Sequence, residues 1–148
     1  LELLRLHGHT SDDLVLVDRG SGVVFAGGLV FAERVPTTPH ADVRPWLQSL
    51  DALEKLLQAM PQATLVPSHG PVHQDRRGMA QTRDWLQWVS SLMEDSARRG
   101  LDLSEVLRTP LPERFQNWAA QPAEFHRTLA QWYPQYEKRA LAQELPGK

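Results

Sequence analysis

Three short segments of the sequence place a histidine or a glycine pair among turn residues, where a strand end can hold side chains for chemistry. They are Gly8-His9-Thr10-Ser11-Asp12-Asp13-Leu14, Phe25-Ala26-Gly27-Gly28-Leu29-Val30-Phe31 and Val66-Pro67-Ser68-His69-Gly70-Pro71. Imidazole nitrogens are common zinc ligands, so His9 and His69 are candidate metal ligands. A loop histidine beside glycine is more often hydrogen-bonded or solvent-facing, and the 60 positions between these two leave their pairing open.

The other polar residues form weaker patterns. Asp12 and Asp13 could form a paired carboxylate site, but a solvated turn whose carboxylates bond the local backbone is the preferred interpretation. The spacings of His7 to His9 and of His69 to His73 are interpreted as coincidence. Two further histidines receive structural roles, one in a loop and one in a helix: His40 and His126.

The elements that would position these residues follow from the hydrophobic pattern. Residues 1–6 have a strand pattern, and residues 14–17 and 23–26 flank an Asp/Gly turn that predicts a hairpin. Gly27-Gly28 then indicates a bulge or a close backbone approach. Asp42 is a plausible cap for a helix that runs to about residue 60, and residues 63–66 predict a buried strand.

The second half of the chain has a helical pattern. We expect a long helix over residues 75–99 that ends at Gly100, a short helix that starts near Ser104, and a last helix over residues 122–142. Pro134 should kink or split that last helix. The order of elements predicts a mixed α/β (α+β) fold in which helices cover one face of a sheet and leave the other face uncovered.

Composition narrows the classes of function. The 148 residues include 16 Lys and Arg against 18 Asp and Glu, so a net charge of -2 gives no reason to expect nucleic acid or an anionic membrane as partner. The sequence has no cysteine, which excludes disulfides and thiolate zinc sites. The first residue is Leu1 and begins in mid-pattern, so we expect the chain to be a fragment of a longer parent protein.

Together, the three segments resemble the metallo-β-lactamase superfamily in order and spacing. The tail of the chain, from Leu101 to Glu105 and from Phe125 to Glu137, is similar to a bacterial subgroup, the quinoprotein-relay or SoxH-like zinc metallohydrolases. The resemblance implies the C-terminal half of an αββα sandwich over residues 1–74, followed by a helical C-terminal extension over residues 75–148.

The resemblance also implies roles for single residues. His9 would bind the first zinc and His69 the second, whereas Gly28 stands where the family has its bridging aspartate. Glycine has no ligand atom, and the His-x-His-x-Asp-His motif of the family's N-terminal half is absent from this sequence. A catalytic zinc usually takes about three protein ligands. We therefore expect zinc binding by this chain alone to be weak or absent and the chain alone to be inactive.

Two functions remain open at this point. The first is a zinc-dependent hydrolase of metallo-β-lactamase type that cleaves an ester, thioester, lactam or similar bond of a small molecule, with one or two zinc ions in the parent protein. The alternative is a non-catalytic, degenerate binding or accessory domain. The uncovered sheet face predicts association with the missing N-terminal half or with a second copy. The subgroup resemblance implies a periplasmic setting.

Overall fold

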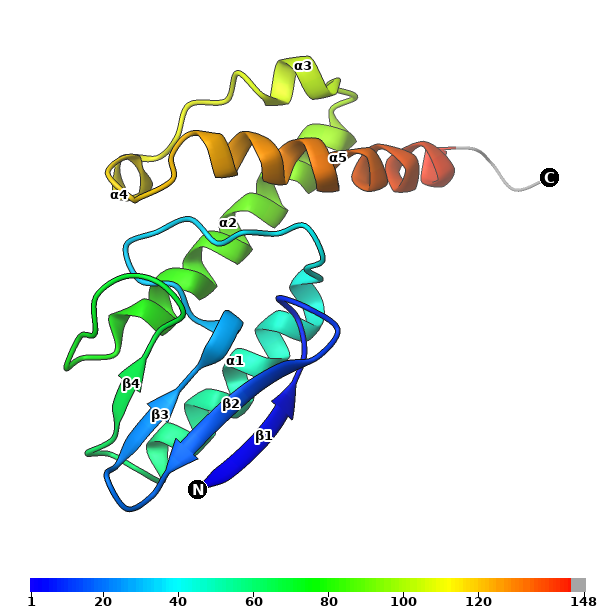
Figure 1. Ribbon diagram of the computed structural model, residues 1–148. Helices are drawn as coiled ribbons and strands as arrows, with labels where there is room; N and C mark the ends of the chain where they lie inside the picture. Colours follow the sequence, from blue (N-terminus) through cyan, green and yellow to red (C-terminus); the bar gives the residue numbers. More distant parts are fainter. Residues whose placement is uncertain (145–148) are drawn as a thin grey trace.

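A computed structural model describes residues 1–144, and its sheet has four strands in the order β1-β2-β3-β4 (Figure 1). β1 pairs with β2 and β2 with β3 in antiparallel fashion, and β3 pairs with β4 in parallel. The strands are β1 (Glu2–Leu6), β2 (Asp13–Asp18), β3 (Val23–Phe25) and β4 (Thr64–Val66). The predicted hairpin and the strand after the first helix are confirmed, because short apolar runs flank the turn residues that the sequence supplies.

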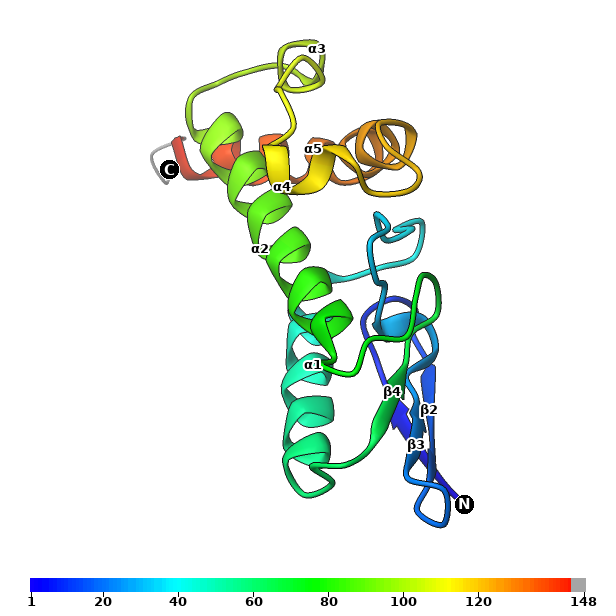
Figure 2. The ribbon, with the colours of Figure 1, turned by 90° about the vertical axis from the view of Figure 1, so that its left-hand side faces the viewer.

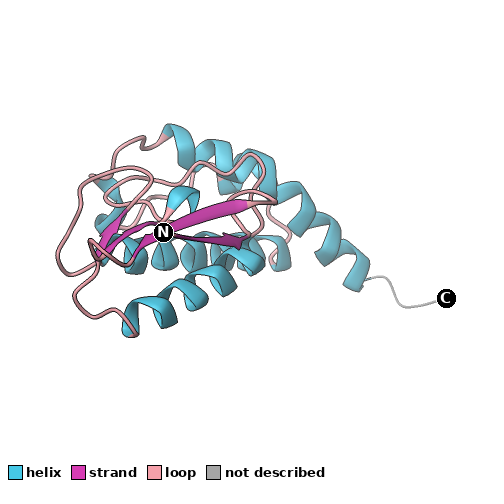
Figure 3. Ribbon diagram, turned by 60° about the horizontal axis from the view of Figure 1, so that its bottom comes forward, coloured by secondary structure: helices cyan, strands magenta, loops and turns pink. Residues whose placement is uncertain are grey.

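The three long helices agree with the sequence patterns, but two short helices were not predicted and the last helix is not split. The helices are η1 (Gly27–Leu29), α1 (Val43–Gln58), α2 (Arg77–Arg98), α3 (Leu103–Val106), α4 (Glu113–Gln116) and α5 (Ala123–Glu144). Asp42 caps α1 as predicted, and its side chain accepts a hydrogen bond from the Arg44 backbone N–H. α4 was not predicted. α5 continues through Pro134 without being split, and its end projects beyond the rest of the molecule (Figure 3).

The two faces of the sheet have different environments. Val15, Val17 and Val24 are fully buried on the inner face, which α1 covers (Figure 2). The outer face carries an apolar row across all four strands, because the strand register aligns Leu3 with Leu16, Leu16 with Phe25, and Phe25 with Val66. Leu3 is 66% exposed and Phe25 44% exposed. The expected uncovered sheet face is therefore present among the described residues.

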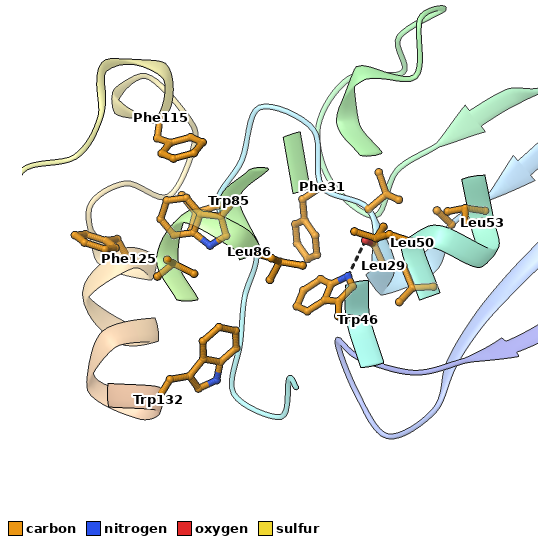
Figure 4. Close-up of a cluster of buried hydrophobic side chains, with 14 of the residues drawn as sticks. Leu29, Phe31, Trp46, Leu50, Leu53, Trp85, Leu86, Phe115, Phe125 and Trp132 are labelled. Atoms are coloured by element: carbon orange, nitrogen blue, oxygen red, sulfur yellow. Dashed lines mark hydrogen bonds between the residues drawn. The ribbon is translucent and has the colours of Figure 1, made fainter. Parts of the chain in front are cut away.

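One hydrophobic core joins the sheet part to the helical part. Figure 4 shows Phe31 and Trp46 between the leucines of α1 and η1 on one side and the aromatic rings of the helical part on the other. The Trp46 indole N–H donates to the Leu29 carbonyl oxygen at 2.9 Å. The division of the chain near residue 74 stays a prediction. No helix among residues 1–144 has both the length and the apolar character needed to cross a membrane.

Candidate metal centre

The three predicted motifs meet at one edge of the sheet. β1, β3 and β4 run in the same direction, because β1 and β3 are both antiparallel to β2 and β4 is parallel to β3. Their C-terminal ends therefore share an edge, which points toward the helical part in Figure 1. His9 follows β1, Gly28 follows β3 and His69 follows β4. The topology places these residues near one another although they are far apart in the sequence.

The His9 side chain packs against two aromatic rings and has a polar neighbour near each ring nitrogen. Its ring lies 5.6 Å from the Phe31 ring and 5.3 Å from the Trp46 ring, centroid to centroid. Nε2 lies 3.3 Å from the Thr37 hydroxyl, and Nδ1 lies 3.6 Å from an Asp13 carboxylate oxygen, which is longer than a hydrogen bond. Only 21% of the side chain is exposed. The imidazole is thus fixed by packing, with its two nitrogens directed to different partners.

Asp13 shapes the loop that carries His9. Its carboxylate accepts hydrogen bonds from the backbone N–H of His9 at 3.0 Å and of Thr10 at 3.1 Å, and from the Thr10 hydroxyl at 3.0 Å. Asp13 is only 5% exposed. The prediction that an aspartate of this pair bonds the local backbone is confirmed, but the expected solvated turn is wrong for Asp13, because β2 starts at this residue and turns its side chain inward.

The environment of His9 lowers its pKa. Burial is the largest cause, because it penalises the charged imidazolium. The Asp13 carboxylate raises the pKa and partly offsets the burial. His69 and His40 contribute smaller electrostatic effects that lower the pKa of His9 further. A neutral imidazole is the form that can bind a metal ion.

His69 is positioned through Phe31. The two rings stack at 5.4 Å with an angle of 23° between their planes. The His69 carbonyl oxygen accepts a hydrogen bond of 2.9 Å from the Ala32 N–H. This bond belongs to a parallel bridge between Phe31 and His69 beyond the ends of β3 and β4. Gly70 follows with φ +92°, and a Cβ at this position would lie 1.8 Å from the Ala32 carbonyl oxygen. Glycine is required here because the two backbones approach so closely.

Gly8 also allows a close approach of two backbones, here between the His9 loop and α1. Its φ is +137°, and a Cβ would lie 2.1 Å from the Trp46 Cα atom. Its carbonyl oxygen accepts a hydrogen bond of 2.7 Å from the Asp42 N–H at the start of α1. The loop can therefore lie directly on α1, and this contact brings His9 beside Trp46.

Gly28 lies directly against His9. A Cβ at this position would be 2.3 Å from the His9 Nδ1 atom, so the imidazole fills the space that a side chain of residue 28 would need. The resemblance implied an aspartate at this position. In this chain the position lacks a carboxylate and also lacks the room for one with His9 where it is. The predicted close backbone approach at Gly27-Gly28 is confirmed, in a short 3-10 helix (η1) and without a strand bulge.

The donor set fits part of one metal site. His9 and His69 provide two imidazoles of the type that zinc prefers, at the same sheet edge. Nowhere in residues 1–144 do three or more His, Asp or Glu side chains gather as a metal would require. A second metal position would need a ligand at residue 28, where none is available. The residues present fit one incomplete zinc position and do not fit a two-metal centre.

Sequence reasoning missed several contributors to this edge. Thr37 and Trp46 contact His9, although the sequence analysis assigned neither of them to the site. Thr38 is fully buried, and its hydroxyl lies 2.9 Å from the Thr128 hydroxyl of α5. Only the tertiary fold brings these residues together, because no local spacing signals contacts across 28 to 90 positions.

Comparison with known proteins agrees with the sequence motifs. Residues 1–69 match the family model described as the metallo-beta-lactamase superfamily. The chain is similar to a solved metallo-beta-lactamase from Pontibacter korlensis, with 32% identity and a TM-score of 0.48 over 58% of this chain and 40% of that chain. It is also similar to the metallo-beta-lactamase FIM-1 from Pseudomonas aeruginosa, solved in the mono-zinc form, with 28% identity and a TM-score of 0.47 over 57% of this chain and 37% of that chain. A search of the curated proteins gave no match.

Residues 1–69, which carry His9, Gly28 and His69, therefore match the metallo-β-lactamase superfamily, and the predicted resemblance is confirmed for this segment. The predicted mixed α/β fold, with a four-stranded sheet and helices, is confirmed as well. The chain spans 40% or less of the length of the two solved structures named above. The narrower similarity to quinoprotein-relay or SoxH-like zinc metallohydrolases stays a prediction.

Proposed function

We propose that this chain is part of a zinc-dependent hydrolase of metallo-β-lactamase type, in which His9 and His69 are metal ligands. The observation that supports this proposal most is the convergence of both histidines on one sheet edge, with the Phe31 ring next to each of them. The family match over residues 1–69 includes both histidines. When bound, zinc supplies Lewis acidity, which activates water and polarises the bond to be cleaved.

The chain's own residues prepare the ligands. Burial favours the neutral imidazole of His9, the form in which a ring nitrogen has a free lone pair. Asp13 fixes the His9 loop through three hydrogen bonds and lies near Nδ1, which favours a proton on that nitrogen and leaves Nε2 as the donor atom. The Thr37 hydroxyl now faces Nε2 and would have to yield that position to a metal ion.

The rest of the site is proposed to come from residues outside this sequence. The chain covers 40% of the Pontibacter korlensis relative, and one zinc needs more ligands than His9 and His69 supply. We infer a small-molecule substrate with a hydrolysable bond such as an ester, thioester or lactam. A periplasmic setting follows from the subgroup similarity and belongs to the same proposal.

Metal analysis tests the proposal. Zinc content should be measured by elemental analysis after gel filtration, on this chain and on a longer protein that includes the preceding sequence. We expect about one zinc per longer protein, a loss of that zinc in His9→Ala and His69→Ala, and no loss in the control His126→Ala, whose side chain is exposed on α5. A longer protein without zinc, or with zinc that both substitutions leave in place, would contradict the proposal.

A second candidate is a non-catalytic binding or accessory domain that has kept the fold and lost the metals. Gly28 favours this candidate, because glycine has no ligand atom at the position of the bridging carboxylate. The His9 ring also occupies the space that a side chain of residue 28 would need. Absence of zinc from the longer protein, together with unchanged stability after chelation, would support it.

A further inference from the structure

Two adjoining clefts lie where α1, α2 and α5 meet. The first has a volume of about 440 Å³, and its wall includes residues from all three helices. The second has a volume of about 780 Å³ and lies mainly between α2 and the C-terminal part of α5. Three residues line both clefts, namely Arg44, Tyr136 and Arg139. Small-molecule sites usually occupy about 300–1,000 Å³, so each cleft has the size of such a site.

Arginine side chains bring positive charge to both clefts. Arg44 lies in the first turn of α1 and Arg139 on α5, and neither side chain makes an ion pair or a hydrogen bond among the described residues. The Arg139 guanidinium lies 5.3 Å from the centroid of the Tyr136 ring, which holds it over the cleft wall. Arg98 also lines the second cleft and pairs with Asp95 at 2.6 Å. Two guanidinium groups are therefore available to an anion.

Two carboxylates line the clefts as well, but they do not cancel this charge. Asp42 lies at the first cleft and caps α1, where it accepts a hydrogen bond of 3.1 Å from the Arg44 backbone N–H. Glu94 lies at the second cleft. The walls thus carry three arginines against two carboxylates, and the N-terminal end of the 16-residue helix α1 adds positive potential. The balance favours an anionic ligand over a cationic one.

The first cleft also has an apolar wall and a hydroxyl without a partner. Leu47 of α1 and Trp132 of α5 supply apolar surface. Ser90 of α2 lines the same cleft, and its Oγ atom is buried and has no hydrogen-bond partner in the part of the chain that the structure describes. Buried hydroxyls are nearly always hydrogen-bonded, so an oxygen atom of a ligand in this cleft would complete the Ser90 side chain.

We propose that the two clefts bind a small organic anion, a phosphate ester or a carboxylate with an apolar body. Arg44 and Arg139 bind the anionic group, because guanidinium groups match the oxygens of phosphates and carboxylates. Ser90 donates a hydrogen bond to the ligand, and Trp132 packs against its apolar body. The inference does not depend on zinc. Since α5 lies outside the family match over residues 1–69, it gives a function to the helical part of the chain.

Calorimetric titration with phenyl phosphate tests the inference on the 148-residue chain. The buffer contains a chelator, so that a metal ion plays no part in the binding. We expect one binding site with a dissociation constant on the order of 1 mM or lower, as suits a ligand of this size. Benzoate, which has a carboxylate in place of the phosphate, should compete for the same site. Phenol and inorganic phosphate each lack one half of the ligand and should bind at least about tenfold more weakly.

Substitutions locate the binding site. Arg44→Gln and Arg139→Gln should each weaken the binding of phenyl phosphate by at least about threefold, and the double variant by about tenfold, because each loses a charge-assisted hydrogen bond that solvent partly screens. Ser90→Ala should weaken it by about threefold. Arg99→Gln is the matched control, because it removes the same charge at the end of α2 from a side chain that lines neither cleft. It should bind like the wild type.

Three results would overturn the inference. The first is a wild-type chain that phenyl phosphate does not saturate below about 10 mM. The second is an equal loss of affinity in Arg99→Gln and in the variants of Arg44 and Arg139, because binding would then follow the overall charge. The third is inorganic phosphate that binds as tightly as phenyl phosphate. Unchanged circular dichroism of each variant excludes unfolding as the cause of lost binding, and the zinc content of the longer protein tests the proposed function separately.

Discussion

The imidazole of His9 lies between two aromatic rings, with one nitrogen facing Thr37 and the other near Asp13. A metal ligand prepared in this way loses little freedom when the ion binds, because packing has already fixed its ring. The same packing has a cost at acid pH. Protonation of His9 would place a charge in a mostly buried position, with the Asp13 carboxylate 3.6 Å away as partial compensation.

The lowered pKa of His9 predicts that metal-free protein loses stability as the pH falls through about 6.5, the ordinary histidine value. In that range the unfolded state takes up a proton that the folded state does not, and the loss continues until the pH reaches the lower folded pKa. The free energy of unfolding in urea, measured with a chelator at pH 7.5 and 5.5, should therefore fall less in His9→Gln than in the wild type. His126→Gln is the control. An equal fall in wild type and His9→Gln would contradict this prediction.

At the scale of elements, the sheet and the long helices were predictable from local pattern. Alternating and continuous apolar runs gave the strands, and Asp42 and Gly100 gave helix ends. The 3-10 helix of Gly27–Leu29 and the four-residue helix α4 were harder to predict from sequence, because the formation of such short elements depends on what packs against them. Asp13 looked like a surface residue because the register of β2 decides which way its side chain points.

The turn between β4 and the next segment offers a test at this scale. Gly70→Ala should destabilise the protein by on the order of 3 kcal/mol or more, because the new Cβ would overlap the Ala32 carbonyl oxygen as well as require a positive φ. Gly22→Ala is a matched control, since Gly22 also has a positive φ (+70°) and no atom within 4 Å of an added Cβ. It should cost only about 1–2 kcal/mol. Equal losses of unfolding free energy in the two variants would contradict the steric argument.

At the scale of the whole molecule, the outer sheet face is an apolar surface that no other element among residues 1–144 covers. The apolar row of Leu3, Leu16, Phe25 and Val66 crosses the full width of the sheet. A face of four short strands measures about 15–20 Å in each direction, so a contact with a second such face lies at the low end of specific interfaces. Association between two copies should accordingly be weak and depend on concentration.

We predict that the isolated chain self-associates through this face. Its mass by light scattering should rise with concentration, and Phe25→Lys should return it to the monomer by placing a charge in the middle of the row. Leu141→Lys is the control, because Leu141 is 63% exposed on α5, away from the sheet. A wild-type chain that stays monomeric at high concentration would show that the face does not bind a second copy.

Threonine hydroxyls connect the sheet edge to the helices, and they determine where the chain can be shortened without loss of these contacts. Thr82 of α2 donates to the Phe31 carbonyl oxygen at 3.0 Å and accepts from the Phe31 N–H at 2.9 Å, and Thr38 meets Thr128 of α5. A polypeptide trimmed to residues 1–69 would keep His9, Gly28, His69 and the whole family match, yet it would lose Gly70 and the partners of Phe31 and Thr38. The end of the family match is therefore not a safe place to cut, and a shortened chain used to test metal binding has to include α2 and the first half of α5.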